Sequence, residues 1–397
     1  MEPQSAGLFV LLLGVFCALL VWLALTKEPV FRVLAACLAF IPAMLFGMAA
    51  VNKYYYNYQS WGAVAADFGG QGLSTLPSDP AGISSQQLTA MLDKVTSSKP
   101  AASDGQALRL VVTGARTRIS RAVYVYLPPQ YFRPAYQRHR FPVAELISGY
   151  PGGPLDWINV MGVIQAYQTL LRDGAAQPAV LVMPDPNGGR QISLQCLNVV
   201  HGPQDATYLA QDVPDYLSRV LRLVPPGRTW AIAGYSEGGY CAANLALLYP
   251  GRYGFAGLLS GYFQPLDDRL GHPSRLVDPF RRSLRLRRLN TPLRQVAALP
   301  FSVMIPQFWL GAGSSDRADV TAARNFQRLL LPRQPDLTLD LVPGGAHSMP
   351  TWRALVPPLL SWLTGRLAAA DHPAPPHAVK TAHASGRHRP RPAASRR

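Results

Sequence analysis

Charged residues, cysteines and internal repeats are all scarce in this chain. Of its 397 residues 15% are charged, and 38 Lys or Arg against 22 Asp or Glu give a formal net charge of +16. This low charge, combined with 48% hydrophobic residues, excludes an intrinsically disordered chain. Four cysteines exclude a disulfide-dense scaffold and a cysteine-rich zinc module. No repeat of roughly 20–50 residues recurs, which excludes a solenoid.

Long uncharged runs are present at the N-terminus. Residues 6–26 match the roughly 20 apolar residues that a membrane-spanning helix needs, and residues 33–52 form a second run containing Pro42. We therefore predict a transmembrane helical hairpin within residues 1–53. A cleaved signal peptide is the alternative, but it requires a basic start and a shorter apolar core.

The few charges around these runs indicate an orientation. Lys27 and Arg32 lie between the two runs, and cytoplasmic loops are enriched in such residues. We expect this loop in the cytoplasm, and the rest of the chain outside a cell membrane that it crosses twice.

Two other segments lack the pattern of a folded core. Residues 54–106 are predicted to be a membrane-proximal linker with one short helix near 86–95. Residues 366–397 contain seven Lys or Arg and one acid among Pro, Ala, Ser and His. This tail is expected to be disordered. We expect this basic tail to bind an anionic surface, such as lipid, wall polymer or nucleic acid. The alternative is a solvated tail that binds no partner.

Residues 107–365 alternate short apolar strands with helices, which indicates an α/β domain with a mostly parallel sheet. Helices are expected over 207–223, 239–249 and 354–367. Strands are expected over 108–113, 122–127, 142–147, 179–183, 229–233, 257–259, 302–310 and 337–341.

A G-x-S-x-G motif lies between the expected strand 229–233 and the helix that follows. It reads Gly234-Tyr235-Ser236-Glu237-Gly238, and small residues are needed two positions before and after the serine because the chain turns sharply there. Such a turn exposes a nucleophile at the start of a helix. We therefore predict that Ser236 is a catalytic nucleophile.

The general base is predicted from chain order. In α/β-hydrolases the serine precedes the acid, and the histidine comes last. His139 and His201 precede Ser236, and His272 follows no strand. His347 follows the last expected strand, directly before the final helix, and is therefore the predicted base.

The acid and the oxyanion hole follow from position. Asp316 comes soon after the strand 302–310 and is the favoured acid, with Asp319 as its competitor. The backbone N–H of Glu237, directly after the nucleophile, is one expected oxyanion donor. The loop 148–153 supplies the second, and Tyr150 is favoured because Pro151 has no N–H.

These motifs resemble the Putative esterase branch of the α/β-hydrolases, which includes esterase D, feruloyl esterases and mycolyltransferases. The resemblance covers about residues 108–363. It depends on Val123–Pro129, Gly149–Gly153 with Asp156-Trp157, Val182–Pro184, Tyr208-Leu209, Asp212–Pro214, the elbow, Ser260-Gly261, Gly313–Asp316 and Gly345–His347 with Trp352.

The resemblance implies an α/β-hydrolase fold and an esterase or acyltransferase that acts through Ser236, Asp316 and His347. It also implies that Gly149, Asp156, Trp157 and Tyr235 contact substrate. Mycolyltransferases usually carry Glu as the acid and Leu in the elbow, whereas this chain has Asp316 and Tyr235. Residues 262–300 occupy the place of a lid and are rich in arginine, which suits lipid head groups, an anionic substrate or solvent.

The remaining expectations concern cross-links and competing functions. Outside the cell, Cys196 and Cys241 are expected to form a disulfide near the active site, with two free thiols as the alternative. Neither a metal nor an organic cofactor is implied, and no nucleic-acid motif is present.

The favoured function is an extracytoplasmic serine esterase acting on a lipid or cell-envelope ester. An acyltransferase, a serine peptidase or amidase, and a catalytically dead binding protein are the alternatives.

Overall fold

The computed structural model describes residues 2–3, 5–55, 61, 74–75, 90, 99–190, 192–266 and 278–371. Most of the expected linker, including its helix near 86–95, lies outside the described residues. The expected basic tail lies outside them beyond residue 371.

The N-terminal segment forms a helical hairpin of α1 (Ala6–Leu25) and α2 (Pro29–Tyr55). The Ser5 side chain accepts a hydrogen bond from the backbone N–H of Leu8 and caps α1. Both helices are long and apolar enough to cross a membrane. Apolar side chains point outward from the pair, with Val10 70% and Phe40 68% exposed. The hairpin buries little of its apolar surface within itself, which suits a lipid environment.

The remaining described residues build a nine-stranded sheet in the order β1-β2-β3-β5-β4-β6-β7-β8-β9. Strands β2, β3 and β5 pair antiparallel, whereas the strands from β5 to β9 along the sheet are parallel. The strands are β1 (Ser74–Thr75), β2 (Gln106–Thr113), β3 (Ser120–Leu127), β4 (Val143–Ile147), β5 (Val180–Pro184), β6 (Gly227–Tyr235), β7 (Tyr253–Leu259), β8 (Gln307–Gly313) and β9 (Leu339–Val342).

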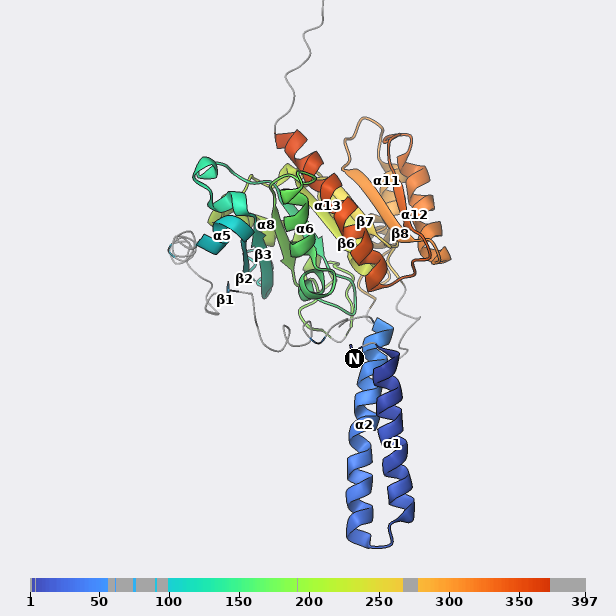
Figure 1. The fold of residues 1–397 in the computed structure, drawn as a ribbon. Coiled ribbons are helices and arrows are strands. Elements are labelled where there is room, and N and C mark those ends of the chain that lie inside the picture. The colour runs from blue at the N-terminus through green and yellow to red at the C-terminus, as the bar shows by residue number, and fades with distance from the viewer. Residues whose placement is uncertain are drawn as a thin grey trace, which may run out of the picture.

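Helices cover both faces of this sheet (Figure 1). One apolar core lies under α6 and α13 and contains Trp157, Tyr235 and Trp352. The other lies under α8, α9, α11 and α12 and contains Tyr240 and Phe326. The helices are α5 (Lys99–Asp104), α6 (Val163–Arg172), α7 (Asp205–Thr207), α8 (Val213–Val220), α9 (Glu237–Leu248), α10 (Leu284–Leu289), α11 (Pro292–Ala298), α12 (Arg317–Leu330) and α13 (Met349–Asp371).

The α/β prediction is confirmed, with some corrected boundaries. Strand β8 begins at Gln307 rather than Ser302, because Phe301 and Ser302 form a turn and residues 303–306 are irregular. The last helix begins at Met349 and continues to Asp371, beyond the predicted end at Leu367. Helices α6 and α12 were not predicted, because each packs only one narrow apolar stripe on the sheet and is otherwise polar.

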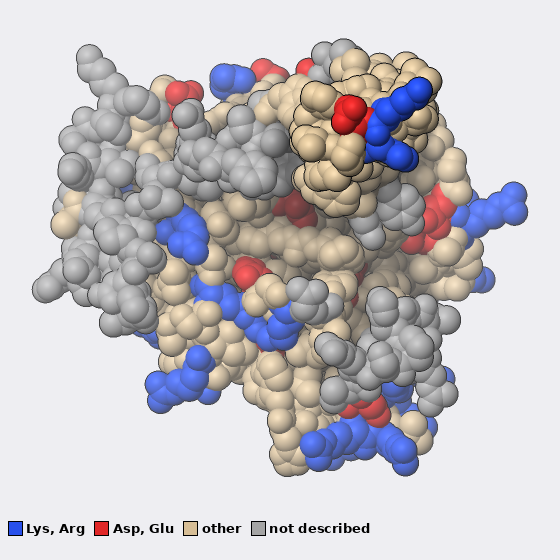
Figure 2. Space-filling model, turned by 90° about the horizontal axis from the view of Figure 1, so that it is seen from below, with Lys and Arg blue, Asp and Glu red and all other residues tan. Residues whose placement is uncertain are grey.

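Because the central strands are parallel, their carboxyl ends meet at one edge of the sheet, where ligands bind in open α/β sheets. In Figure 1 the hairpin extends from the side of the domain on which α6 and α13 begin, which is this same edge. Seen from that side, the face is hollowed near its centre, with acidic side chains inside the hollow and basic side chains around it (Figure 2).

Candidate active site

Ser236 occupies a strained turn between β6 and α9. Its φ of 54° and ψ of −121° lie in a region that residues other than glycine rarely adopt. A Cβ atom at Gly234 would lie 2.1 Å from the carbonyl oxygen of Gly238, and one at Gly238 would lie 2.2 Å from that of Ile147. The turn therefore requires glycine at both positions, as the motif predicts for a nucleophile elbow.

His347 contacts the predicted nucleophile directly. It lies in the loop between β9 and α13, and its Nε2 is 2.8 Å from Ser236 Oγ. The ring of Trp352, from the first turn of α13, meets the imidazole edge-on at 4.9 Å between centroids. The position of the ring is thus fixed by an aromatic contact as well as by its hydrogen bonds.

The carboxylate paired with His347 is that of Asp319, and the prediction of Asp316 is wrong in this respect. Asp319 Oδ2 lies 2.7 Å from His347 Nδ1. Asp316 is instead the N-cap of α12, and its Oδ1 accepts hydrogen bonds from the N–H groups of Ala318 and Asp319 at 2.9 and 3.0 Å. A capping side chain folds back onto its own helix, whereas the residue three positions later projects from the first turn.

The charges around His347 favour its protonated form. Partial burial by itself lowers the pKa of the imidazole, but the hydrogen bond and charge of Asp319, with the charge of Asp316, raise that pKa overall. The ligand atoms of these three residues lie within 4.8 Å of one another. The two ring nitrogens face Ser236 and Asp319, so the arrangement suits proton transfer from a serine.

The loop 148–153 passes close to Ser236. A Cβ atom at Gly149 would lie 3.1 Å from Ser236 Cβ and 2.8 Å from the Tyr235 ring, so only glycine fits there. Asp156 holds this loop: its Oδ2 accepts hydrogen bonds from the N–H of Gly153 at 2.9 Å and from the Tyr235 hydroxyl at 2.7 Å. Gly149 thus lies beside Ser236, the predicted nucleophile.

Two of the expected substrate contacts are wrong. The side chains of Trp157 and Tyr235 are 0% and 1% exposed, so neither can reach a bound substrate. The Tyr235 ring packs against Trp157 and Trp352, at 5.4 and 4.7 Å between centroids. Tyr235 therefore connects the loop held by Asp156 with the aromatic ring that positions His347.

A disulfide joins Cys196 to Cys241 of α9, with 5.7 Å between the Cα atoms, which confirms the predicted pair. The loop containing Cys196 also contacts the buried Glu237, through a hydrogen bond from the hydroxyl of Ser193 to the carboxylate. Sequence reasoning missed Ser193 because an isolated loop serine has no distinguishing pattern.

The same disulfide loop holds the basic insertion at two described residues, Leu266 and Pro279. Gln195 donates to the carbonyl of Leu266 at 3.2 Å and accepts from its N–H at 2.9 Å. The N–H of Val200 donates to the carbonyl of Pro279 at 3.0 Å. The insertion is therefore fastened to a loop that is itself cross-linked to the helix that begins at the nucleophile.

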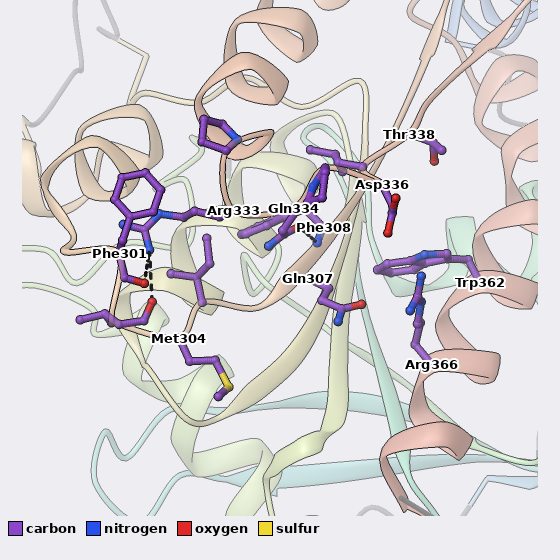
Figure 3. A pocket seen from close by; sticks show the side chains of 15 residues that line it. Phe301, Met304, Gln307, Phe308, Arg333, Gln334, Asp336, Thr338, Trp362 and Arg366 are labelled. Atoms are coloured by element: carbon purple, nitrogen blue, oxygen red, sulfur yellow. Dashed lines mark hydrogen bonds between the residues drawn. The ribbon is translucent and has the colours of Figure 1, made fainter. Parts of the chain in front are cut away.

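A hollow of about 550 Å³ lies elsewhere, at the amino ends of β8 and β9. Figure 3 shows Phe301, Met304 and Arg333 on one side of it and Trp362 and Arg366 of α13 on the other. It contains none of the residues around Ser236. Its place at the opposite edge of the sheet separates it from the candidate active site.

Comparison with known proteins identifies relatives along the sheet-forming part of the chain. The family model described as "Putative esterase" matches residues 114–363. A Corynebacterium glutamicum protein described as uncharacterized is 27% identical over 255 residues, covering 62% of this chain and 58% of that protein. The MPT51/MPB51 antigen of Mycobacterium bovis is 42% identical over 120 residues, covering 30% of this chain and 37% of the antigen. This chain thus spans less than two thirds of the length of either relative.

Solved structures share the fold at low sequence identity. A ferulic acid esterase superposes with a TM-score of 0.57 at 16% identity, covering 66% of this chain and 98% of that one. An S-formylglutathione hydrolase from Agrobacterium tumefaciens has a TM-score of 0.50 at 18% identity, covering 65% and 96%. With the elbow, the His347 loop and the parallel sheet, these matches show that the chain belongs to the Putative esterase family and has the α/β-hydrolase fold.

Proposed function

We propose that this protein is a membrane-anchored serine esterase that cleaves an ester through Ser236, His347 and Asp319. The observation that carries the proposal is the continuous set of contacts from Ser236 Oγ to His347 Nε2 at 2.8 Å and from His347 Nδ1 to Asp319 at 2.7 Å. A structural histidine in a loop has no reason to contact both a strained serine and a carboxylate. This arrangement also argues against a catalytically dead binding protein.

In the proposed reaction, Ser236 Oγ attacks the ester carbonyl carbon while His347 Nε2 accepts the hydroxyl proton. The Asp319 carboxylate holds the imidazole and stabilises the imidazolium that forms. The backbone N–H groups of Glu237 and Tyr150 stabilise the oxyanion, and one such donor is worth about 3 kcal/mol in related sites. His347 then protonates the leaving alcohol, and an acyl-enzyme remains on Ser236.

Breakdown of the acyl-enzyme decides between hydrolysis and transfer. Water activated by His347 releases a carboxylic acid, whereas a sugar or lipid hydroxyl in its place forms a new ester. Gly149 and Asp156 border the site on the side of the loop 148–153. The ester substrate belongs to the lipid or cell-envelope class, because the chain carries its own hydrophobic hairpin.

The proposed location is the outer side of a membrane, with α1 and α2 as its anchor. Their length and apolar composition support this placement. The Cys196–Cys241 disulfide supports an extracytoplasmic domain, because disulfides persist in oxidising compartments and are rare in the cytosol. Lys27, between the helices, and Arg32, in the first turn of α2, support a cytoplasmic location of this end of the hairpin.

The full-length protein in detergent, assayed on p-nitrophenyl esters of increasing acyl length, tests the proposal. Wild type should turn over at least one ester and bind a fluorophosphonate covalently. Ser236→Ala should lose both properties, and His347→Ala should lose turnover, while their circular dichroism spectra match that of wild type. An added alcohol that raises p-nitrophenol release and yields a new ester would identify transfer.

Two results would contradict the proposal. One is a folded wild type that neither hydrolyses any ester of the series nor reacts with the fluorophosphonate. The other is a Ser236→Ala variant that retains wild-type turnover.

A further inference from the structure

The described part of the basic insertion presents an unusual helix face to solvent. In α10, Leu284, Arg285, Arg288 and Leu289 are exposed, with Leu284 67% and Leu289 44% accessible. Since successive helical residues are about 100° apart, these four side chains form one continuous outer face. The opposite face packs inward through Leu286, which contacts the apolar core. The outer face therefore carries two arginines flanked by two leucines, and presents both charge and apolar surface to solvent.

The turn before α10 adds two more arginines to this surface. Arg281 and Arg282 are exposed and both adopt positive φ, at 45° and 64°. Asp278 fixes the turn, because its carboxylate accepts hydrogen bonds from the N–H groups of Phe280 at 3.0 Å and Arg282 at 2.5 Å. Such a turn is well defined and costs strain, and it holds the two arginines beside α10.

Asp278 offsets part of the charge of this surface. Burial raises the pKa of its carboxyl, but backbone hydrogen bonds and the charges of Arg287 and Arg282 lower that pKa overall. Within the described residues, the guanidinium groups of Arg281, Arg282, Arg285 and Arg288 form no ion pair with a carboxylate. By contrast, Arg287 packs over the Phe280 ring at 5.6 Å and belongs to the inner side. Four arginines and two exposed leucines therefore share one surface, which we call the α10 surface.

The α10 surface lies close to the candidate active site. The Tyr240 hydroxyl, on the first turn of α9, donates to the carbonyl of Asn290 directly after α10 at 2.7 Å. Tyr262, which follows β7, stacks on the Tyr240 ring at 5.0 Å. Because α9 begins at Ser236, α10 belongs to the same edge of the sheet as the nucleophile. This is also the side from which the hairpin extends in Figure 1.

We propose that the α10 surface docks onto an anionic phospholipid bilayer and holds the carboxyl edge of the sheet, with Ser236, against that membrane. Arginines near such a surface are attracted to acidic head groups, and exposed leucines insert at the boundary with the acyl chains. A soluble polyanion matches the arginines but leaves the leucines in water, so a bilayer fits the whole surface better. The inference rests on the proposed membrane anchoring and is independent of the proposed chemistry.

The experiment uses the full-length chain in nanodiscs of phosphatidylglycerol or of phosphatidylcholine. An environment-sensitive fluorophore is attached at Leu284→Cys, with Cys17→Ala and Cys37→Ala removing the free thiols. A second protein carries the same fluorophore at Asp173→Cys, beyond the end of α6 at the opposite edge of the sheet. The variant set Arg281→Gln, Arg285→Gln and Arg288→Gln is compared with a matched set of exposed arginines near that opposite edge, Arg138→Gln, Arg172→Gln and Arg328→Gln.

Docking predicts a blue shift of the label at position 284 in phosphatidylglycerol, which high salt reverses, and no shift of the label at position 173. Each arginine near an anionic surface contributes about fivefold to the docked population, so the triple variant should lose roughly 100-fold while the matched set loses little. An unshifted label, an equal shift in phosphatidylcholine, or equal effects of the two variant sets would overturn the inference. A response to soluble polyphosphate in place of lipid would overturn it in favour of a soluble polyanion.

Failures of the separate proposals are distinguishable. A chain that does not co-elute with nanodiscs contradicts membrane anchoring by the hairpin. A chain that co-elutes without a shift contradicts docking alone. Turnover of a water-soluble ester tests Ser236 and does not enter either readout.

Discussion

Two carboxylates, those of Asp316 and Asp319, lie near His347, and replacing Asp319 by Asn distinguishes their roles. The amide keeps the size of the side chain but loses the negative charge and presents the wrong partner for Nδ1–H. His347 then loses the group that holds its tautomer and stabilises the imidazolium. Asp316→Asn is the matched control, because Asn caps a helix about as well as Asp and preserves the start of α12.

The magnitude follows from the exposure of the pair. The corresponding change in a buried serine-protease triad lowers kcat about 10⁴-fold. Here the His347 side chain is 39% exposed and that of Asp319 is 14% exposed, so water compensates part of the loss. We therefore expect kcat to fall about 10³-fold in Asp319→Asn, and less than about 3-fold in Asp316→Asn, which touches neither Ser236 nor the imidazole.

The pH profile of kcat/KM provides a second readout. The charge of Asp316 is one of the causes that raise the pKa of His347. Removing that charge lowers the pKa, so the neutral base persists to lower pH and the acidic limb of the profile shifts downward. Steady-state assays on a p-nitrophenyl ester, with melting curves for folding, measure both effects. A larger loss of kcat in Asp316→Asn than in Asp319→Asn would refute the assignment of the acid.

Three further outcomes follow from the structure. Cys196→Ser with Cys241→Ser should lower the free energy of unfolding by about 2–4 kcal/mol, measured by urea denaturation, and a variant as stable as wild type would contradict this. Burial raises the pKa of Glu145 from its ordinary 4.5 to about 8, so wild type should lose stability as the pH rises between these values. Glu145→Gln should lack that decline and melt above wild type at pH 8, and parallel melting curves across this range would argue against a buried neutral acid. Gly238→Ala should abolish folding or turnover, because its Cβ would lie 2.2 Å from the carbonyl oxygen of Ile147, whereas Gly153→Ala, with nothing within 4 Å, should be tolerated in expression and thermal-melting assays.

The sequence alone predicted the parts of the candidate site at which a local pattern allows only one structure. The strained elbow at Ser236 needs glycines on both sides, and chain order selected His347, whose imidazole contacts Ser236 in the structure. The choice between Asp316 and Asp319 as the acid depended on the direction of each side chain. Both aspartates follow β8, but the Asp316 side chain turns back to cap α12. The pattern Asp-x-x-Asp at the start of a helix indicates that the first aspartate is the cap, whereas distance from the strand end does not.

The errors at Trp157 and Tyr235 have a different cause. Both flank the active-site motifs in sequence, yet both side chains point into the core under α6 and α13. Alternation along a strand decides which neighbours of a catalytic residue face substrate, and at a sharp elbow this alternation is interrupted. Tyr235 packs against Trp352, more than 100 positions later in the chain, and Trp157 packs against Tyr235, so both depend on tertiary contacts.

The bonds from Gln195 to Leu266 and from Val200 to Pro279 also make the anchoring of the basic insertion depend on the oxidation state of the protein. Both bonds come from the loop that the Cys196–Cys241 disulfide joins to α9. In a reducing compartment the same chain would keep the turn at Ser236 but lose the cross-link that ties this loop to α9.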